Sequence, residues 1–164
     1  MAQEVGNTLP DSLCEHLSGR DLSARMGEAI LLTTTDAQGW PHPALLSYAE
    51  LVAVDSSRLR LALYRTSRTS GNLRRSGKLT VCLIGPNMAY YIKAAVAAWQ
   101  DPMEGFAHLA RFEAQVESVL ADRTREDLEP GACITGGIRF DPGRPIAEAL
   151  RKWRGVMDGL RSET

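Results

Sequence analysis

The chain has 164 residues, a mass of 17.9 kDa and a formal net charge of −1, with 44% hydrophobic and 24% charged residues. This composition is typical of a soluble globular domain and excludes a wholly disordered, collagenous or coiled-coil protein. The near-zero net charge disfavours dedicated nucleic-acid binding, and no apolar run approaches the roughly 20 residues that a membrane span needs. We therefore expect a single domain over residues 1–164 that binds neither nucleic acid nor membrane.

The cysteine pattern gives no indication of a metal site. Cys14, Cys82 and Cys133 are isolated from one another, so neither a disulfide framework nor a zinc site is predicted. The N-terminal residues have no basic segment followed by an apolar stretch, so no secretory signal peptide is predicted. These observations favour a cytoplasmic protein without a bound metal.

The first predicted element is a short helix over residues 8–19. Pro10 suits its first turn, Ser12 and Glu15 could form a capping box, and Gly19 suits its C-terminal cap. The helix is expected to precede a β-rich region that runs from about residue 28 to 141.

Strand patterns fill most of that region. The segment EAILLTTTD ends in a turn at 36–39, and WPHPALLSYAELVAVD reads as one long strand whose early prolines fit a sheet edge. RLRLALY alternates leucine with mostly charged residues, which is typical of a half-buried strand. KLTVCLI and MAYYIKAAVAAW follow, joined by a turn at 85–87. Short strands joined by tight turns predict an antiparallel barrel or sandwich.

The remaining segments are a strand and a helix. Residues 110–122 fit either a strand or a helix, and we favour the strand. Residues 131–140 are expected to be extended. Between residues 145 and 160 the apolar side chains fall on one helical face, so a C-terminal helix is predicted.

The segment 65–78 concentrates positive charge and contains no acidic residue. Its cations are Arg65, Arg68, Arg74, Arg75 and Lys78, and between them lie Thr66, Ser67, Thr69, Ser70 and Asn72. Guanidinium groups, hydroxyls and backbone amides at a helix start are the groups that bind a phosphate dianion. A solvated charged loop, a phosphate-binding loop and a nucleic-acid patch are the alternatives. The third is disfavoured because no aromatic residue is interleaved for base stacking.

The other candidate functional residues lie far from one another in the sequence and form no motif. His42 could act as a base or ligand, but a structural role is favoured at this strand entrance. Trp40 could cover a flat ligand, and packing is the favoured alternative. His108 is expected to be exposed in a connecting segment, and Cys133 has no basic partner nearby in sequence.

Residues 39–84, GWPHPALLSYAELVAVDSSRLRLALYRTSRTSGNLRRSGKLTVCLI, resemble the pyridoxamine 5′-phosphate oxidase-like family of flavoproteins. The shared pattern is a G-x-P-H hairpin, a strand ending in L-L-S, a further strand with an S-x-T-x-x-N-L loop, and another apolar strand. The likeness runs from about Glu28 to Ala98 and more loosely to Phe140. It implies a mainly β (α+β) fold: a six-stranded antiparallel Greek-key split barrel with flanking N-terminal and C-terminal helices. It also implies a homodimer with FMN between the subunits.

The resemblance implies a cofactor site as well. The FMN-binding residues it implies are Leu45, Leu46, Ser47, Tyr64, Arg65, Ser67, Arg68, Thr69, Asn72 and Arg75. The first three match a strand whose backbone meets the isoalloxazine ring, and Ser67–Thr69 match a phosphate-binding segment. Tyr91 and Lys93 match positions that can face the partner subunit's flavin. No catalytic side chain is assigned, because the flavin itself would carry out the redox chemistry.

The chain departs from the true oxidases at three places. Pro43 or Ala44 stands where the first matching strand of those enzymes has an arginine, and Thr69 stands where they have a lysine. The C-terminal Arg-x-His motif of their substrate site is absent. The sequence thus predicts an FMN-dependent oxidoreductase with an unknown small-molecule substrate rather than pyridoxamine phosphate oxidation. A deazaflavin-dependent reductase and a non-catalytic flavin- or haem-binding module are the alternatives.

Overall fold

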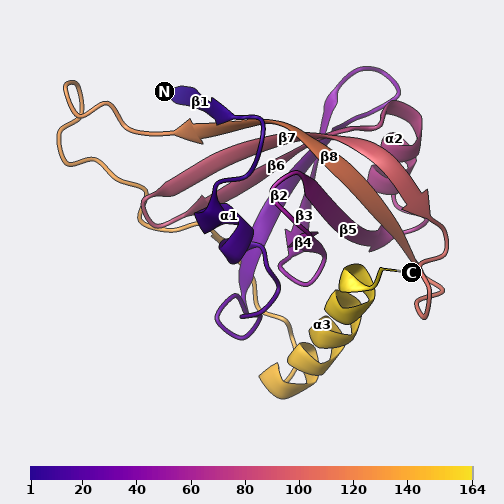
Figure 1. The fold of residues 1–164 in the computed structure, drawn as a ribbon. Coiled ribbons are helices and arrows are strands. Elements are labelled where there is room, and N and C mark those ends of the chain that lie inside the picture. The colour runs from indigo at the N-terminus through magenta and orange to yellow at the C-terminus, as the bar shows by residue number, and fades with distance from the viewer. Residues whose placement is uncertain (164) are drawn as a thin grey trace.

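The computed structural model describes residues 1–163, and its strands form one antiparallel sheet (Figure 1). The sheet follows the order β3–β2–β6–β7–β8–β5–β4, with β1 paired to β8 and β9 paired to β2. The strands are β1 (Ala2–Gly6), β2 (Glu28–Thr35), β3 (Pro41–Ser47), β4 (Leu51–Ala53), β5 (Arg58–Tyr64), β6 (Lys78–Gly85), β7 (Met88–Gln100), β8 (Leu109–Asp122) and β9 (Ile138–Arg139). The helices are α1 (Asp11–His16), α2 (Arg68–Ser76) and α3 (Ile146–Arg161).

The two ends of this strand order are joined by a tight turn. β3 and β4 are outermost in the sheet but consecutive in sequence, and Glu50 N–H donates to the Ser47 carbonyl at 3.1 Å to close the turn between them. The Glu50 carbonyl then accepts the Ala62 N–H of β5 at 2.9 Å. The sheet therefore curls until a turn joins its two edge strands, which do not pair with each other.

The antiparallel α+β architecture is confirmed, but the predicted count of six strands is wrong: residues 1–163 contain nine. The segment predicted as one long strand breaks at the 47–50 turn into β3 and β4. The turn has no glycine, proline or asparagine to mark it in the sequence. Two short strands, β1 and β9, extend the sheet further, and a two-residue strand leaves no periodic pattern to detect.

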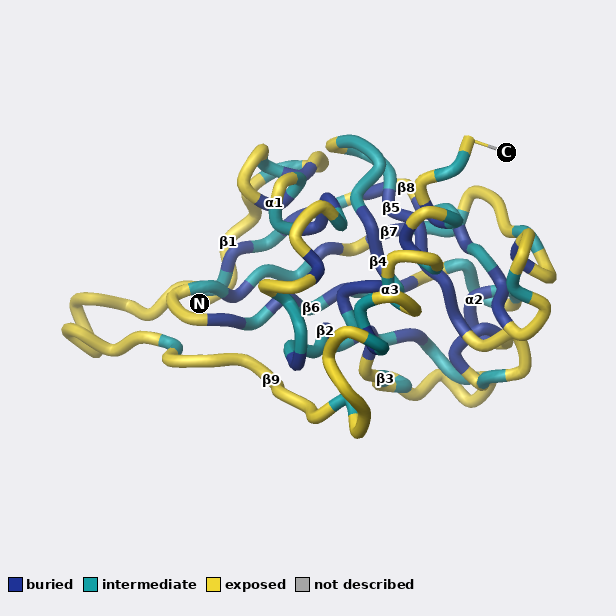
Figure 2. Tube along the Cα trace, turned by 90° about the horizontal axis from the view of Figure 1, so that it is seen from below, coloured by how far each residue is buried: buried dark blue, intermediate teal, exposed yellow. Residues whose placement is uncertain are grey.

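The core lies inside the curled sheet and is covered by helices at its openings. Alternate side chains of each strand point inward, as for Ile30 and Leu32 of β2, which are fully buried. α1 contributes Leu13 and the following Leu17, and α3 contributes Leu160. Figure 2 shows the buried trace running through the strands, whereas residues 123–133 form a wholly exposed arm that projects from the body.

The helix predictions are confirmed with shifted bounds. The C-terminal helix expected at 145–160 spans Ile146–Arg161, and the segment 110–122, ambiguous in sequence, forms the strand β8. The opening helix is shorter than the predicted 8–19. It begins after Pro10 with no side-chain cap, so the capping box of Ser12 and Glu15 is wrong. Residues 131–140 are irregular apart from β9.

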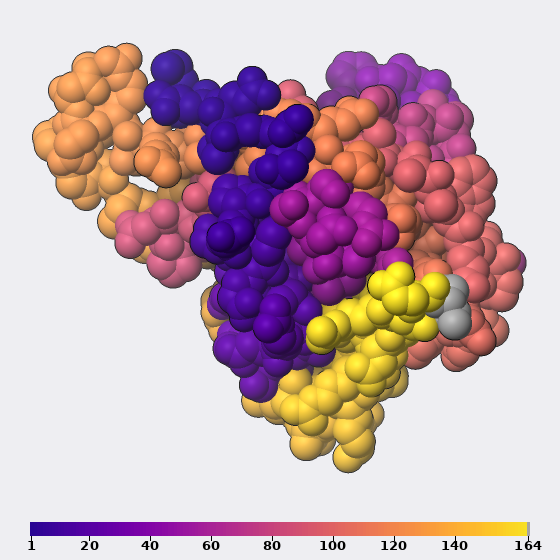
Figure 3. Space-filling view, in the orientation of Figure 1, coloured from indigo at the N-terminus to yellow at the C-terminus, as the bar shows by residue number. Residues whose placement is uncertain are grey.

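Two arginines hold the C-terminal end of α3 against the sheet. Arg60 of β5 is 4% exposed and donates to the carbonyls of Leu160 at 3.1 Å and Ser162 at 2.8 Å. Arg111 of β8 donates to the Gly159 carbonyl at 3.3 Å. Cationic donors satisfy the free carbonyls at a helix C-terminus and oppose its negative dipole end. The space-filling view shows α3 lying against the body with this end close to β8 (Figure 3). No helix among residues 1–163 has the length and apolar character to cross a membrane.

Candidate functional site

The start of α2 is fixed to the end of β5 by serine side chains. Ser67 is the N-cap residue, and its Oγ accepts the Ser70 N–H at 3.1 Å. The Ser70 hydroxyl donates to the Tyr64 carbonyl at 2.8 Å. Gly77 ends the helix in a left-handed conformation with φ of 66°, which glycine adopts without strain. The first turn of α2, with its free backbone N–H groups, is thus held rigidly beside Tyr64.

Three of the five predicted cations form ion pairs with acidic side chains of the chain. Asp101 binds Arg65 Nε at 2.8 Å and Arg74 at 2.6 Å, and Arg74 also donates to the Arg65 carbonyl at 3.0 Å. Lys78 pairs with Glu117 at 3.2 Å. Two carboxylates, Asp101 from the loop that follows β7 and Glu117 from β8, therefore offset part of the positive charge of segment 65–78.

Arg68 differs from these residues. It is exposed in the first turn of α2, and no hydrogen bond or ion pair joins its side chain to another group within residues 1–163. Arg75, by contrast, donates to the Thr35 carbonyl at the end of β2. A free guanidinium beside free helix N–H groups is suited to a phosphate.

The other two predicted phosphate-site residues are buried. Asn72 is 8% exposed, and its side-chain amide donates to the Thr34 hydroxyl of β2 at 3.0 Å. Thr69 is 6% exposed. Thr34 is paired in the sheet with His42, so the Asn72 bond attaches α2 to β2, one strand from the start of β3. Asn72 therefore holds α2 in place, and the predicted phosphate segment lies one strand away from the predicted ring strand.

β3 is an edge strand whose outward backbone groups are almost all accounted for. Asp36 N–H donates to the Trp40 carbonyl at 2.9 Å, so in this register the residues with even numbers bond to β2 and those with odd numbers face outward. Pro41 and Pro43 have no N–H, which is why prolines are tolerated here. The Ser47 N–H donates to Glu50 Oε2 at 2.7 Å. Over the described part of the chain, the outward N–H of β3 without a partner is that of Leu45.

The three predicted ring residues thus have different environments. Leu45 is 59% exposed at the open edge, with both its N–H and its carbonyl free for a ligand. Leu46 is 5% exposed and belongs to the core. Ser47 is held by Glu50. Trp40, at the hairpin before β3, was expected to pack, but it is 71% exposed. That prediction is wrong because the 36–39 turn carries the side chain beyond the sheet.

His108 lies beside the predicted site, although nothing in the sequence around it indicates this position. His108 is exposed, as expected, but its ring lies 5.9 Å from that of Tyr64, measured between ring centroids. Its carbonyl accepts the Arg65 N–H at 3.1 Å. Only the pairing of β5 with β8 brings these residues together, and no local sequence pattern predicts that pairing.

The outward face of the sheet carries an apolar row across five strands. Sheet register aligns the members of this row, which are Leu45, Leu31, Cys82, Tyr91 and Leu120. All but Leu45 are of intermediate exposure. A polar row lies beside it and consists of Thr33, Thr80, Lys93 and Ser118. The apolar row is only partly covered within the chain, and such a row suits a contact with another molecule.

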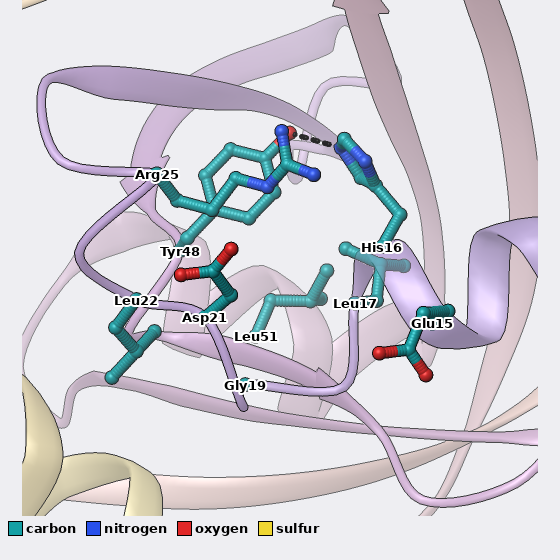
Figure 4. Close-up of a pocket in the computed structure, with 9 residues that line it drawn as sticks. All are labelled: Glu15, His16, Leu17, Gly19, Asp21, Leu22, Arg25, Tyr48 and Leu51. Carbon is teal, nitrogen blue, oxygen red and sulfur yellow. Dashed lines mark hydrogen bonds between the residues drawn. The ribbon is translucent and has the colours of Figure 1, made fainter.

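A separate small pocket lies between α1 and the β3–β4 turn (Figure 4). The hydroxyl of Tyr48 is 2.8 Å from His16 Nε2, and the Arg25 guanidinium lies over the Tyr48 ring at 5.6 Å. Burial, together with the charge of Arg25, lowers the pKa of His16, and burial raises the pKa of Tyr48 to about 12. Both groups are therefore neutral at pH 7. A cavity of about 20 Å³ has room for little more than one water, so it cannot hold a flavin.

The described residues show no metal-binding group. No set of three or more His, Cys, Asp or Glu side chains within residues 1–163 is arranged to hold a metal ion.

Comparison with known proteins gives relatives of the whole chain and of its fold. No protein-family profile matches the sequence. The uncharacterized protein YclD of Bacillus subtilis strain 168 is 31% identical over 155 residues, which cover 94% of this chain and 97% of YclD.

Solved structures share the fold at low sequence identity. A candidate pyridoxamine 5′-phosphate oxidase from Lactobacillus delbrueckii superposes with a TM-score of 0.57 and 16% identity, covering 71% of this chain and 98% of that protein. An FMN-binding protein from Syntrophomonas wolfei gives a TM-score of 0.52 and 13% identity, covering 70% of this chain and 90% of that protein. The resemblance inferred from the motifs is thereby confirmed at the level of the fold. The chain belongs to the same family as YclD and has the fold of the pyridoxamine 5′-phosphate oxidase-like proteins.

Proposed function

We propose that this protein binds FMN and acts as a homodimeric oxidoreductase on a small molecule. The observation that carries the proposal is the free Arg68 guanidinium at the start of α2, next to an edge strand with an open backbone donor and acceptor at Leu45. A phosphate and a flat heterocycle with carbonyl groups are what these two features would bind. The FMN-binding protein of the same fold supports the choice of ligand.

The two features are linked through β2. Asn72 of α2 is bonded to Thr34, and Leu31, three residues earlier on β2, is paired with Leu45. The contact of α2 with the sheet therefore lies about 10 Å along β2 from the level of Leu45. An extended ligand with a phosphate at one end and a ring at the other suits such an arrangement.

Each part of the site would have a distinct task. Bound FMN would supply the redox chemistry. Arg68 and the α2 N–H groups would hold its phosphate, and the Leu45 backbone would orient the ring. Arg65 lies beside this site, but its pairing with Asp101 gives it the task of fixing the loop before β8. No side chain is required as a general base.

A second copy of the chain would cover the apolar row. The row crosses five strands, and its end at Leu45 coincides with the proposed ring position. A dimer contact there would bury the row and enclose the flavin between subunits, with the exposed Lys93 nearby.

The first experiment is the visible spectrum of the freshly purified protein, followed by acid release of any chromophore and its identification by mass. We expect flavin absorption and the mass of FMN, and light scattering should give the mass of two chains. Titration with FMN and with a deazaflavin cofactor, in separate samples, identifies the preferred ring. A colourless protein that binds neither compound would contradict the proposed function.

A further inference from the structure

Glu50, in the turn between β3 and β4, takes part in four hydrogen bonds. Its Oε2 accepts the Ser47 N–H at 2.7 Å and the Ser47 hydroxyl at 2.8 Å. Its own N–H donates to the Ser47 carbonyl at 3.1 Å, and its carbonyl accepts the Ala62 N–H at 2.9 Å. Side chain and backbone are therefore both fixed, and the carboxylate has one position relative to β3.

The carboxylate is also without a counter-charge. No lysine, arginine or histidine pairs with Glu50 anywhere in residues 1–163, and partial burial raises the pKa of its carboxyl group while the Ser47 bonds act to lower it. A glutamine could make the same two bonds, since a single oxygen accepts both. The turn thus uses a charge that its hydrogen bonds do not need, and a poorly solvated charge is costly to keep.

The position of this charge relies on the register of β3. The N–H groups of Leu45 and Ser47 point off the same edge of the strand, and two residues of strand span about 7 Å. Glu50 Oε2 occupies the point that the Ser47 N–H addresses. The carboxylate is therefore the next group along the edge, about 7 Å from any ligand atom that accepts the Leu45 N–H.

We propose that Glu50 is a positioning residue of the flavin site, which closes the Ser47 end of the β3 edge and sets a fixed negative charge in line with the ring. The inference rests on the proposed function. Closing the edge leaves Leu45 as the donor that selects the ligand's orientation. A fixed negative charge near the ring disfavours the electron-rich reduced flavin relative to the oxidised form, so it lowers the reduction potential.

The test compares Glu50→Gln with the wild-type protein, both loaded with FMN. The substituted side chain retains an oxygen acceptor for Ser47 but removes the charge. We expect oxidised FMN to bind within about twofold of wild type, as for a merely structural turn. The affinity for reduced FMN should rise about tenfold relative to that for oxidised FMN. This change raises the midpoint potential of a two-electron couple by about 30 mV.

Two further variants complete the design. Tyr48→Phe removes the hydrogen bond between this turn and His16 but leaves the Glu50 charge and its Ser47 bonds, so its potential should stay at the wild-type value. Glu129→Gln removes an exposed carboxylate from the projecting arm and should change neither affinity nor potential.

Three outcomes overturn the inference, and they are distinguishable. An unchanged potential in FMN-loaded Glu50→Gln would show that the charge does not act on the ring. Loss of folding or of FMN in Glu50→Gln, while Tyr48→Phe retains both, would make Glu50 a turn-closing residue alone. A wild-type protein that does not bind FMN would overturn the proposed function, and this inference with it.

Discussion

The C-terminal end of α3 and the N-terminal end of α2 both involve arginines, but the chain treats those arginines in opposite ways. At α3, Arg60 is 4% exposed and bonds to Glu113 at 2.8 Å as well as to two carbonyls. At α2, Arg68 is exposed and meets no partner within the described residues. The polar groups of the first region have partners within the chain, whereas the second region leaves exposed donors free for a ligand or another chain.

The apolar residues of the two regions differ in the same way. Met157 and Leu160 of α3 are 2% and 0% exposed. Around α2 and β3, Trp40, Leu45 and Tyr64 are 71%, 59% and 62% exposed. Large exposed apolar groups and an unpaired cation in one region are typical of a binding surface. The number of charged residues in a sequence segment does not show which cations are paired in the fold.

The largest expected effect tests the self-contained region. Arg60→Ala should lower the free energy of unfolding by about 3 kcal/mol, because it removes the closer of the two arginine partners of Glu113 and the side-chain donor to the Leu160 carbonyl. Urea unfolding at pH 7 measures this change. Arg151→Ala, at an exposed position on the same helix, is the control and should change stability by less than about 0.5 kcal/mol. A small effect of Arg60→Ala would mean that α3 is held by its apolar face alone.

The second-largest effect concerns the region around Arg68, where ligand binding rather than stability should change. Arg68→Ala should leave stability unchanged, because the side chain has no partner among residues 1–163. It should weaken FMN binding roughly tenfold to a hundredfold, since hydrogen bonds to charged groups contribute about 1.5–3 kcal/mol. Fluorescence titration measures the affinity, with Arg154→Ala on α3 as the matched loss of an exposed arginine. Equal affinity in both variants would remove Arg68 from the proposed phosphate site.

Much of the fold follows from local sequence, and the exceptions have physical causes. α3 was predicted because its 16 residues carry a regular helical pattern. The pattern of residues 110–122 fitted a strand or a helix, and the preference for a strand is confirmed by β8. The break between β3 and β4 was not predicted, because the turn of residues 47–50 has no glycine, proline or asparagine and is supported by the Glu50 side chain and by a bond from the distant Ala62.

The sequence nominated the residues of the candidate site, but it could not show which of them remain free of partners within the chain. The sequence placed Arg65 and Arg68 in one cationic segment, yet Asp101, which engages Arg65 and Arg74, lies well beyond that segment. Likewise, the open edge at Leu45 depends on the register with β2. Which groups remain free is decided by tertiary contacts, so local pattern can nominate a site residue but cannot show that it is unoccupied.

The smallest expected effect concerns the contribution of Asp55 to the stability of the region that holds α3. Asp55, in the turn before β5, accepts bonds from the Arg58 side chain at 2.7 Å and from the Ser57 N–H at 2.8 Å. Partial burial acts to raise the pKa of Asp55, but these bonds outweigh it and lower the pKa to about 2 from an ordinary 3.8. A lowered pKa in the folded state means that the ionised form stabilises the fold. That stabilisation is complete above about pH 4 and is lost as the pH falls through about 2.

Asp55→Asn should therefore be less stable than wild type at pH 6, and the difference should narrow towards pH 2. The Asp55 side chain is 41% exposed, so screening by water limits the effect to about 1 kcal/mol or less. Urea midpoints at pH 6, 4 and 2.5 measure the trend, and Asp21→Asn, at an exposed position, is the control. A difference that stays constant with pH would show that Asp55 acts through turn geometry that asparagine disturbs. Its charge, and the ion pair with Arg58, would then contribute nothing to the region that holds α3.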